Sequence, residues 1–249
     1  CSHAGYNRAR VWQDANRCVC SNGSAMKSSP EDHEPRWHAA LAVIVALLLY
    51  VTLPPRVVVG PLWLLPALTL VILVPLMIIA PRRHKEAGWQ RMASIMNIAL
   101  LNAFNIGTIV LLFVWQLSTH HRRTITGEQL LFAAVEIWLT NVIVFALWFW
   151  ELDGHGPDVR THMPVDQQII RSDFLFPQMM LHPDVCARLN WKPRFIDYVF
   201  LSFTNATAFS PTDTFPITRL AKILMMAEAA ASLVTIALIA GRAVNILGT

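Results

Sequence analysis

The chain carries little charge for its length. Only 14% of its 249 residues are Asp, Glu, Lys or Arg, whereas 55% are hydrophobic. A soluble domain of this size normally uses about a quarter charged residues to cover its surface. The composition therefore excludes a disordered chain, a fibrous repeat and a water-covered globular domain. We expect an α-helical integral membrane protein, with the lipid bilayer covering much of its surface.

Cysteine is also scarce, with four residues in the chain: Cys1, Cys18, Cys20 and Cys186. They contain no Cys-x-x-Cys motif, so neither a disulfide scaffold nor a zinc site is expected. The chain lacks Gly-x-Ser-x-Gly, a phosphate-binding loop and a dinucleotide fingerprint. We therefore expect no enzyme activity, no cofactor and no metal. His120-His121, and the group Asp153, His155 and Asp158, are interpreted as parts of solvated loops because they lack metal-ligand spacing.

Residues 1–36 form a polar N-terminal tail that lacks the apolar h-region of a signal peptide. Met26 begins a short segment that leads directly into the first apolar run. We hypothesise that translation begins at Met26 and that residues 1–25 are not native, with lipidation of Cys1 as the alternative. N-terminal sequencing of the native protein tests this hypothesis.

Five apolar segments have the composition of membrane spans, which need about 20 mostly apolar residues. They are residues 37–53, 60–80, 92–117, 129–150 and 217–247. Three prolines, at 61, 66 and 75, predict kinks or a break in the second span. Tryptophans near the span ends, Trp37, Trp115, Trp148 and Trp150, are typical of membrane interfaces.

A sixth apolar segment, residues 195–209, is too short to cross a bilayer alone and follows a polar stretch over about 152–194. We expect it to form an interfacial or re-entrant helix, which exists at membrane depth only when buried in protein or lining water. The sequence thus divides into a three-span region (37–123) and a C-terminal module (124–249).

Basic residues indicate the orientation rather than a nucleic-acid partner, which we do not expect. The chain has 20 Lys and Arg against 16 Asp and Glu, for a formal charge of +4. Arg82, Arg83, Lys85 and Arg91 crowd the loop between the second and third spans. The positive-inside rule puts this loop and the N-terminus in the cytoplasm. Five spans then leave the C-terminus outside, which conflicts with the topology of the channels considered next.

The C-terminal module has the order outer helix, polar linker, short helix, polar turn and long helix. This order resembles the two-helix pore module of potassium channels. Ser202-Phe203 and Thr207 match its typical Ser-Phe-x-x-x-Thr, and Asp213 falls where the filter ends in Asp. Further residues resemble the start of its inner helix: Pro216, Arg219, Ala221 and Glu228-Ala229. The resemblance implies a homotetramer with a pore on its axis.

The filter departs from the potassium-channel pattern. Ser210 and Thr212 stand where that pattern has glycines, and Pro211 stands where it has Tyr. Those glycines take backbone angles that residues with a Cβ avoid, and proline fixes φ and removes a donor. We therefore do not expect a potassium-selective filter. Ser232, or Ala231, stands near the usual hinge glycine, so a bend there is not assured.

The chain is also similar to a group of small bacterial membrane proteins of unknown activity, whose C-terminal part resembles a degenerate pore module. The similarity rests on three segments, at residues 148–153, 173–178 and 202–213, and extends over about 129–247. It implies a multi-pass protein of the bacterial inner membrane.

Five polar residues follow or end the short helix and are the candidate pore mouth or ion path: Asn205, Thr207, Ser210, Thr212 and Asp213. Hydroxyl and carbonyl oxygens suit hard cations, and the Asp213 carboxylate attracts them. The alternative interpretation is a helix-ending turn in which Thr212 or Asp213 caps the following helix.

Two carboxylates, Glu136 and Glu228, lie inside predicted spans, where charges are costly. They are candidates for a proton or cation relay, or for hydrogen-bonded pairs between helices. Asn97, Asn102 and Asn105 line a polar path or, as the favoured interpretation, bond between helices.

We expect a pore-loop, channel-like protein that conducts a cation, with monovalent ions as candidates. The alternatives are a non-conducting structural or accessory subunit of the same fold and a proton-coupled transporter.

Overall fold

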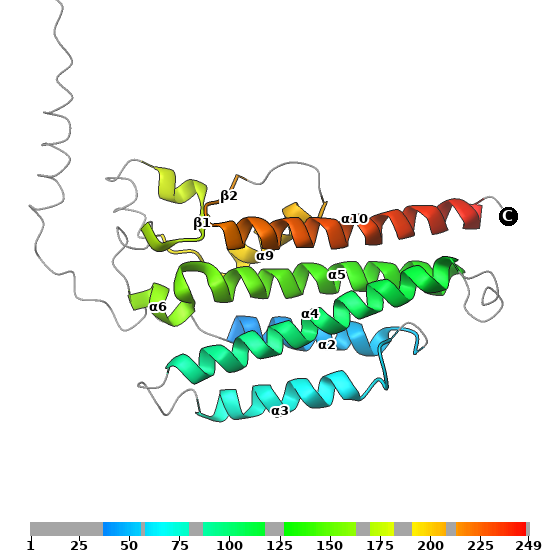
Figure 1. The fold of residues 1–249 in the computed structure, drawn as a ribbon, viewed down its shortest axis with the longest axis horizontal. Helices are drawn as coiled ribbons and strands as arrows, with labels where there is room; N and C mark the ends of the chain where they lie inside the picture. The colour runs from blue at the N-terminus through cyan, green and yellow to red at the C-terminus, as the bar shows by residue number, and fades with distance from the viewer. Residues whose placement is uncertain are drawn as a thin grey trace, which may run out of the picture. The chain divides into compact units, whose positions relative to one another are not determined.

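A computed structural model of the chain describes residues 37–55, 58–79, 87–117, 127–162, 170–181, 191–207 and 213–247. Residues 34–249 form one compact unit, and most of the described residues are helical (Figure 1). The predicted tail, with the hypotheses about Met26 and Cys1, lies outside the described residues.

Each predicted apolar span contains one helix. These are α2 (Trp37–Thr52), α3 (Leu64–Ile79), α4 (Ala87–Leu117), α5 (Gly127–Leu152) and α10 (Arg219–Leu247). Three stretches are long and apolar enough to cross a membrane: Gly88–Val114 in α4, Glu128–His155 in α5 and the three residues that follow it, and Arg219–Gly241 in α10. Helices α2 and α3 have 16 residues each, which corresponds to about 24 Å. The count of five crossing helices stays a prediction.

Prolines set the start of α3 rather than breaking it. The helix begins at Leu64, whose backbone N–H donates to the carbonyl oxygen of Pro61 (2.9 Å). Pro66 then lies in the first turn, where a missing N–H removes no helical hydrogen bond. The helix therefore begins four residues later than the predicted span, and it continues through Pro75 to Ile79.

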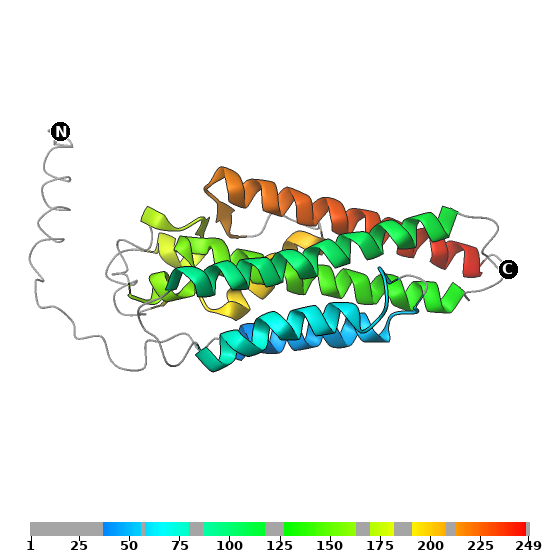
Figure 2. The ribbon, with the colours of Figure 1, turned by 60° about the horizontal axis from the view of Figure 1, so that its bottom comes forward.

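Helix α5 lies at the centre of the bundle and packs against α2, α4, α9 and α10 (Figure 2). In its most apolar 18-residue window 61% of the residues are buried, compared with 22% for α10. Both helices are apolar on all sides, as membrane spans are, and α5 is the more buried because four helices pack around it. Phe145 and Phe149 form part of the resulting core.

Short elements fill the predicted linker and the approach to α10. They are η3 (Asp153–His155), α6 (Pro157–His162), β1 (Phe174–Leu175), η4 (Pro177–Met180), α9 (Phe195–Thr207) and β2 (Phe215–Pro216). Strands β1 and β2 pair antiparallel, with Phe174 opposite Pro216 and Leu175 opposite Phe215. The linker is therefore anchored to the chain just before α10.

Helix α9 begins at one end of the bundle and ends part-way along it (Figure 1). At its start, the rings of Phe195 and Trp150 lie 5.9 Å apart, beside the end of α5. At its other end, Asn205 Nδ2 donates to the carbonyl oxygen of Met225, which lies in the second turn of α10 (2.9 Å). We call the end of the bundle where α5 ends and α9 and α10 begin the Asp153 end.

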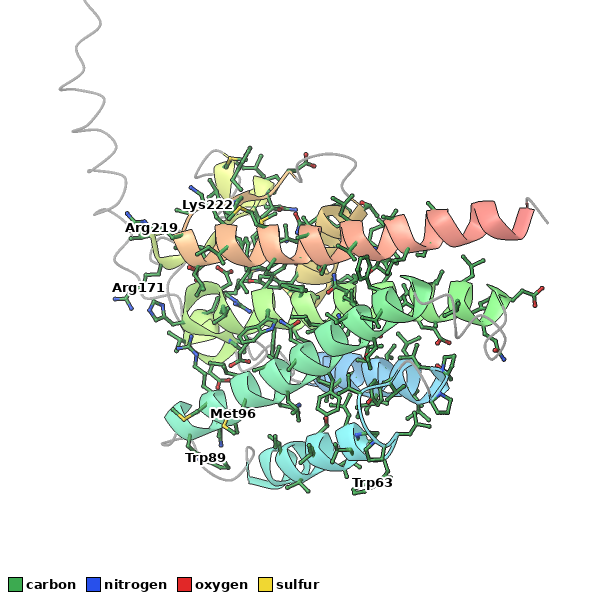
Figure 3. All side chains as sticks on the ribbon, turned by 45° about the vertical axis from the view of Figure 1, so that its right-hand side comes forward. Trp63, Trp89, Met96, Arg171, Arg219 and Lys222 are labelled. Carbon is green, nitrogen blue, oxygen red and sulfur yellow. The ribbon has the colours of Figure 1, made fainter. Side chains whose placement is uncertain are left out.

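The cationic residues are distributed unevenly along the bundle. Apart from Arg242 near the end of α10, every Lys and Arg among the described residues lies at the Asp153 end. Figure 3 labels three of them, Arg171, Arg219 and Lys222, whereas Trp63 lies at the opposite end.

Candidate functional site

The strongest candidate site is a carboxyl group inside the bundle. Glu228 lies on α10 and is fully buried. Ser202 and Asn205 are three residues apart on α9 and therefore share one face of that helix. Asn205 Nδ2 donates to Glu228 Oε2 (2.6 Å), and the Ser202 hydroxyl is hydrogen-bonded to Glu228 Oε1. Neutral polar groups from a second helix thus surround both carboxyl oxygens.

Hydrogen bonds extend this site to two further helices. Asn141 Nδ2, on α5, donates to Ser232 Oγ (2.9 Å) and to the Glu228 carbonyl oxygen (3.5 Å). Asn105 Nδ2, on α4, donates to Asn141 Oδ1 (3.1 Å). We call this set the interior polar network: Asn105, Asn141, Ser202, Asn205, Glu228 and Ser232. It joins α4, α5, α9 and α10 by hydrogen bonds between helices, which contribute to helix association in a membrane.

The predicted pore-mouth residues do not act together in the described part of the chain. Asn205 points toward Glu228 and belongs to the interior polar network. The Thr207 hydroxyl donates to the Thr204 carbonyl oxygen in its own helix (2.9 Å). Asp213 is exposed, and Ser210 and Thr212 lie outside the described residues.

The two predicted intramembrane carboxylates have different surroundings. Glu228 is fully buried with two side-chain partners, whereas Glu136 is only half-buried on α5. The Glu136 carbonyl oxygen accepts from the Thr140 hydroxyl (2.8 Å), a bond within one turn of the same helix. Of the two carboxylates, Glu228 is therefore the one that the packed helices enclose.

The three asparagines of α4 also differ in their hydrogen bonding and burial. Asn105 makes the interhelical hydrogen bond that the sequence interpretation favoured. Asn97 is buried, and its Oδ1 has no hydrogen-bond partner among the described protein atoms. Asn102 is half-buried, and its Oδ1 likewise has no hydrogen-bond partner among the described protein atoms.

A second buried carboxylate, Asp153, lies at the Asp153 end. Its Oδ1 accepts from the backbone N–H groups of Asp173 (2.7 Å) and Phe174 (3.2 Å). The Ser172 hydroxyl lies 3.0 Å from Asp153 Oδ1 and 2.6 Å from the Phe174 carbonyl oxygen, and its single hydrogen is shared between these two acceptors. Its Oδ2 accepts from the Tyr198 hydroxyl (2.6 Å). One side chain thereby joins the end of α5, strand β1 and the first turn of α9.

Arg160 supplies the positive charge next to this carboxylate. Its Nη1 lies 3.8 Å from Asp153 Oδ2 and donates to the carbonyl oxygens of Asp153 (2.8 Å) and Trp150 (3.2 Å). The guanidinium also lies over the Tyr198 ring, 5.1 Å from its centroid, where the ring quadrupole attracts a cation. We call this group the Asp153 clamp: Asp153, Arg160, Ser172 and Tyr198, with the backbone of Asp173 and Phe174.

The sequence interpretation of this segment as a solvated loop was wrong for Asp153, which has no exposed surface. It holds for His155, which is exposed, whereas Asp158 is half-buried. Gly154 and Gly156 have φ angles of 57° and 101° and turn the chain sharply after α5. The feature of the sequence that could have identified Asp153 as buried is its position between the apolar segment of α5 and this glycine turn.

Asp173 connects the clamp to α10. Its carbonyl oxygen accepts from the Ile217 N–H (2.9 Å), and its Oδ1 accepts from the Thr218 hydroxyl (2.6 Å). Thr218 Oγ also accepts from the Ala221 N–H (3.2 Å) and so caps α10. The prediction that Asp213 caps this helix was wrong, because the helix begins six residues later; the other predicted cap, Thr212, lies outside the described residues.

Comparisons with known proteins identify no relative. No protein-family model, curated protein or solved structure matches the chain. In the described part of the chain, no group of three or more His, Cys, Asp or Glu is placed to hold a metal ion. The features that bear on function are therefore the interior polar network, the Asp153 clamp and the path of α9.

Proposed function

We propose that the protein is a multi-pass protein of the bacterial inner membrane, in which α2, α3, α4, α5 and α10 cross the bilayer. Helix α9 is its re-entrant pore helix, and several copies, four by resemblance to the potassium-channel module, form a pore that conducts a cation.

The path of α9 carries this proposal. The helix begins beside Trp150 at the Asp153 end and reaches the level of Glu228 at Asn205. Its 13 residues correspond to about 20 Å, short of the roughly 30 Å hydrocarbon core. The chain must then be back at the Asp153 end by Phe215, which pairs with Leu175. A segment that enters the membrane as a helix and returns to the same side has the arrangement of a pore loop.

Burial by protein makes such a segment stable at membrane depth. Ser202 and Asn205 anchor α9 to α10, and the Ser202 hydroxyl also lies 2.7 Å from the Val142 carbonyl oxygen on α5. The segment that follows α9 carries Ser210, Thr212 and Asp213, whose oxygens and charge suit a cation. We propose these three residues, with Thr207, as the pore mouth.

The cationic residues support an orientation for this loop. Lys and Arg gather at the Asp153 end, and cytoplasmic loops carry the excess of such residues. Helix α9 then enters from the cytoplasm, opposite to the direction of the pore helix in potassium channels. This orientation follows the positive-inside rule and keeps a re-entrant loop, but it departs from the topology of potassium channels.

One observation favours the alternative, a non-conducting structural subunit. Asn205 and Ser202, which border the proposed mouth, are both engaged inside the chain with Glu228. A polar network whose groups form hydrogen bonds with one another stabilises a fold without any bound ion.

Ion flux through purified protein in liposomes distinguishes the two functions. We expect wild type to release a trapped monovalent cation faster than empty liposomes. Asp213→Asn removes the exposed charge of the mouth and is expected to lower the preference for cations over anions. Glu128→Gln, an exposed acid at the start of α5, is the matched control and is expected to behave as wild type.

Two results of this experiment would contradict different parts of the proposal. Folded wild-type protein that conducts no ion contradicts the channel function and supports the structural subunit. Conduction that is identical in wild type and Asp213→Asn contradicts the proposed mouth while leaving conduction in place.

A further inference from the structure

We propose that Glu228 is a proton-binding site. Its carboxyl group carries a proton while α9 is docked against α5 and α10, and it exchanges this proton with water that enters along α4 from the Asp153 end. This inference does not rest on ion conduction, because a structural subunit with the same interior polar network has the same site.

The number of available hydrogens assigns the proton. The Ser202 hydroxyl contacts two acceptor groups, the Val142 carbonyl oxygen (2.7 Å) and Glu228 Oε1. A serine hydroxyl has one hydrogen, and a carbonyl oxygen can only accept. When Ser202 donates to Val142, the hydrogen in its second contact must come from Glu228 Oε1. Glu228 Oε2 remains an acceptor for Asn205 Nδ2 (2.6 Å), so a carboxylic acid satisfies every contact.

The charged surroundings agree with this assignment. Among the side chains that the structure describes, the other ionisable groups on α10 and on the helices that pack against it are Arg91, Glu128, Glu136, Glu151, Asp197, Tyr198, Arg219 and Lys222. The hydrogen bonds that reach the Glu228 carboxyl come from the neutral side chains of Ser202 and Asn205. Lys222 is exposed and lies six residues before Glu228, nearer the Asp153 end. A carboxylate without a cationic partner at this depth is costly.

A row of polar groups on α4 connects this site to the Asp153 end. Gln90, Asn97 and Asn105 are all buried, and they follow one another at intervals of about 10 and 12 Å along the helix. Gln90 Nε2 and Asn97 Oδ1 have no hydrogen-bond partner among the described protein atoms. Buried polar atoms are normally paired, and internal water pairs those that protein leaves open.

The row ends at the interior polar network. Asn105 donates to Asn141, which in turn donates to Ser232 and to the Glu228 carbonyl oxygen. The interior polar network therefore continues the row of α4 to the helical turn that carries Glu228. Release of the proton converts the carboxylic acid and water into a carboxylate and hydronium. Ser202 then turns its hydrogen to the carboxylate, and the Val142 carbonyl oxygen loses its contact with α9.

Infrared spectroscopy of the purified protein in lipid tests the proton. We expect a carbonyl band of a protonated carboxylic acid at neutral pH that disappears in Glu228→Gln. Glu136→Gln, the other carboxylate within an apolar stretch, is the control and should keep the band. Absence of the band from folded wild type, or its persistence in Glu228→Gln, overturns the assignment.

Deuterium exchange of the same band tests the route. Transfer to heavy water shifts the band as the carboxyl proton is replaced, and the rate reports the access of water. Asn97→Leu fills the route with an apolar side chain and is expected to slow the exchange by about tenfold. Met96→Leu, at an exposed position next to Asn97 on the same helix, is the control and should exchange as wild type. If Asn97→Leu does not fold, Gln90→Leu replaces it. Equal rates in the route variant and the Met96→Leu control overturn the route.

Discussion

Replacing Asp153 tests whether the Asp153 clamp holds the C-terminal half of the bundle together. Asp153→Ala removes the acceptor of two backbone N–H groups, the Ser172 hydroxyl and the Tyr198 hydroxyl. It also leaves the buried Arg160 guanidinium without its carboxylate. Tyr198→Phe removes only one of these bonds and keeps the aromatic ring in place.

The two substitutions differ in expected cost. Loss of one hydrogen bond to a charged group costs about 1.5–3 kcal/mol. Breaking a buried ion pair by removing one partner costs about 3–5 kcal/mol. For a chain of this size, each kcal/mol shifts the midpoint of thermal unfolding by about 2–4 °C. We therefore expect a decrease of about 3–12 °C for Tyr198→Phe and about 6–20 °C for Asp153→Ala.

Thermal unfolding in detergent or nanodiscs measures these shifts. His155→Asn is the control, because His155 is exposed two residues from Asp153 and has a φ of 69° that asparagine tolerates. We expect this control to unfold within about 2 °C of wild type. If Asp153→Ala unfolds within a few degrees of wild type, or above Tyr198→Phe, the clamp does not stabilise the fold as described.

Two further substitutions test the packing and the start of α10. A Cβ added at Gly107 would lie 2.7 Å from Val59 Cγ2, so Gly107→Ala is expected to lower the free energy of unfolding by about 1–3 kcal/mol. Adding Val59→Ala to this variant is expected to recover most of that loss. If the effects of the two substitutions on the unfolding midpoint are simply additive, the contact is contradicted. Thr218→Val removes the hydroxyl that caps α10 and bonds to Asp173. It is expected to cost about 0.5–2 kcal/mol, whereas Thr218→Ser should unfold near wild type, and equal midpoints for the two variants would contradict the cap.

The long helices were predictable because each is specified within its own segment. An apolar run of sufficient length predicts a helix in a membrane, because the backbone there must form its hydrogen bonds within the protein. Helix α5, predicted over 129–150, spans Gly127–Leu152, and α10, predicted from 217, begins at Arg219. Helix α3 differs more, because its start depends on the local turn at Pro61.

The partners of the polar residues were less predictable, because they come from distant segments. Glu228 is identifiable from its position in an apolar span, but its partner Asn205 lies 23 residues earlier on another helix. Asn205 was predicted to face a pore mouth, and the packing of α9 on α10 turns it to the carboxyl group instead. Likewise, Asp153 was assigned to a loop because Ser172 and Tyr198, which bury it, are 19 and 45 residues away.

Labelling with a membrane-impermeant thiol reagent tests the path of α9 most directly. In a variant whose four native cysteines are replaced by serine, single cysteines are introduced at Ile196 and Asp213, on either side of α9, and at Trp63 at the opposite end. All three positions are exposed. The re-entrant path predicts that the first two react from the cytoplasmic side, in inverted vesicles, and that Trp63→Cys reacts from the opposite side. Reaction of Ile196→Cys and Asp213→Cys from opposite sides of the membrane would contradict it.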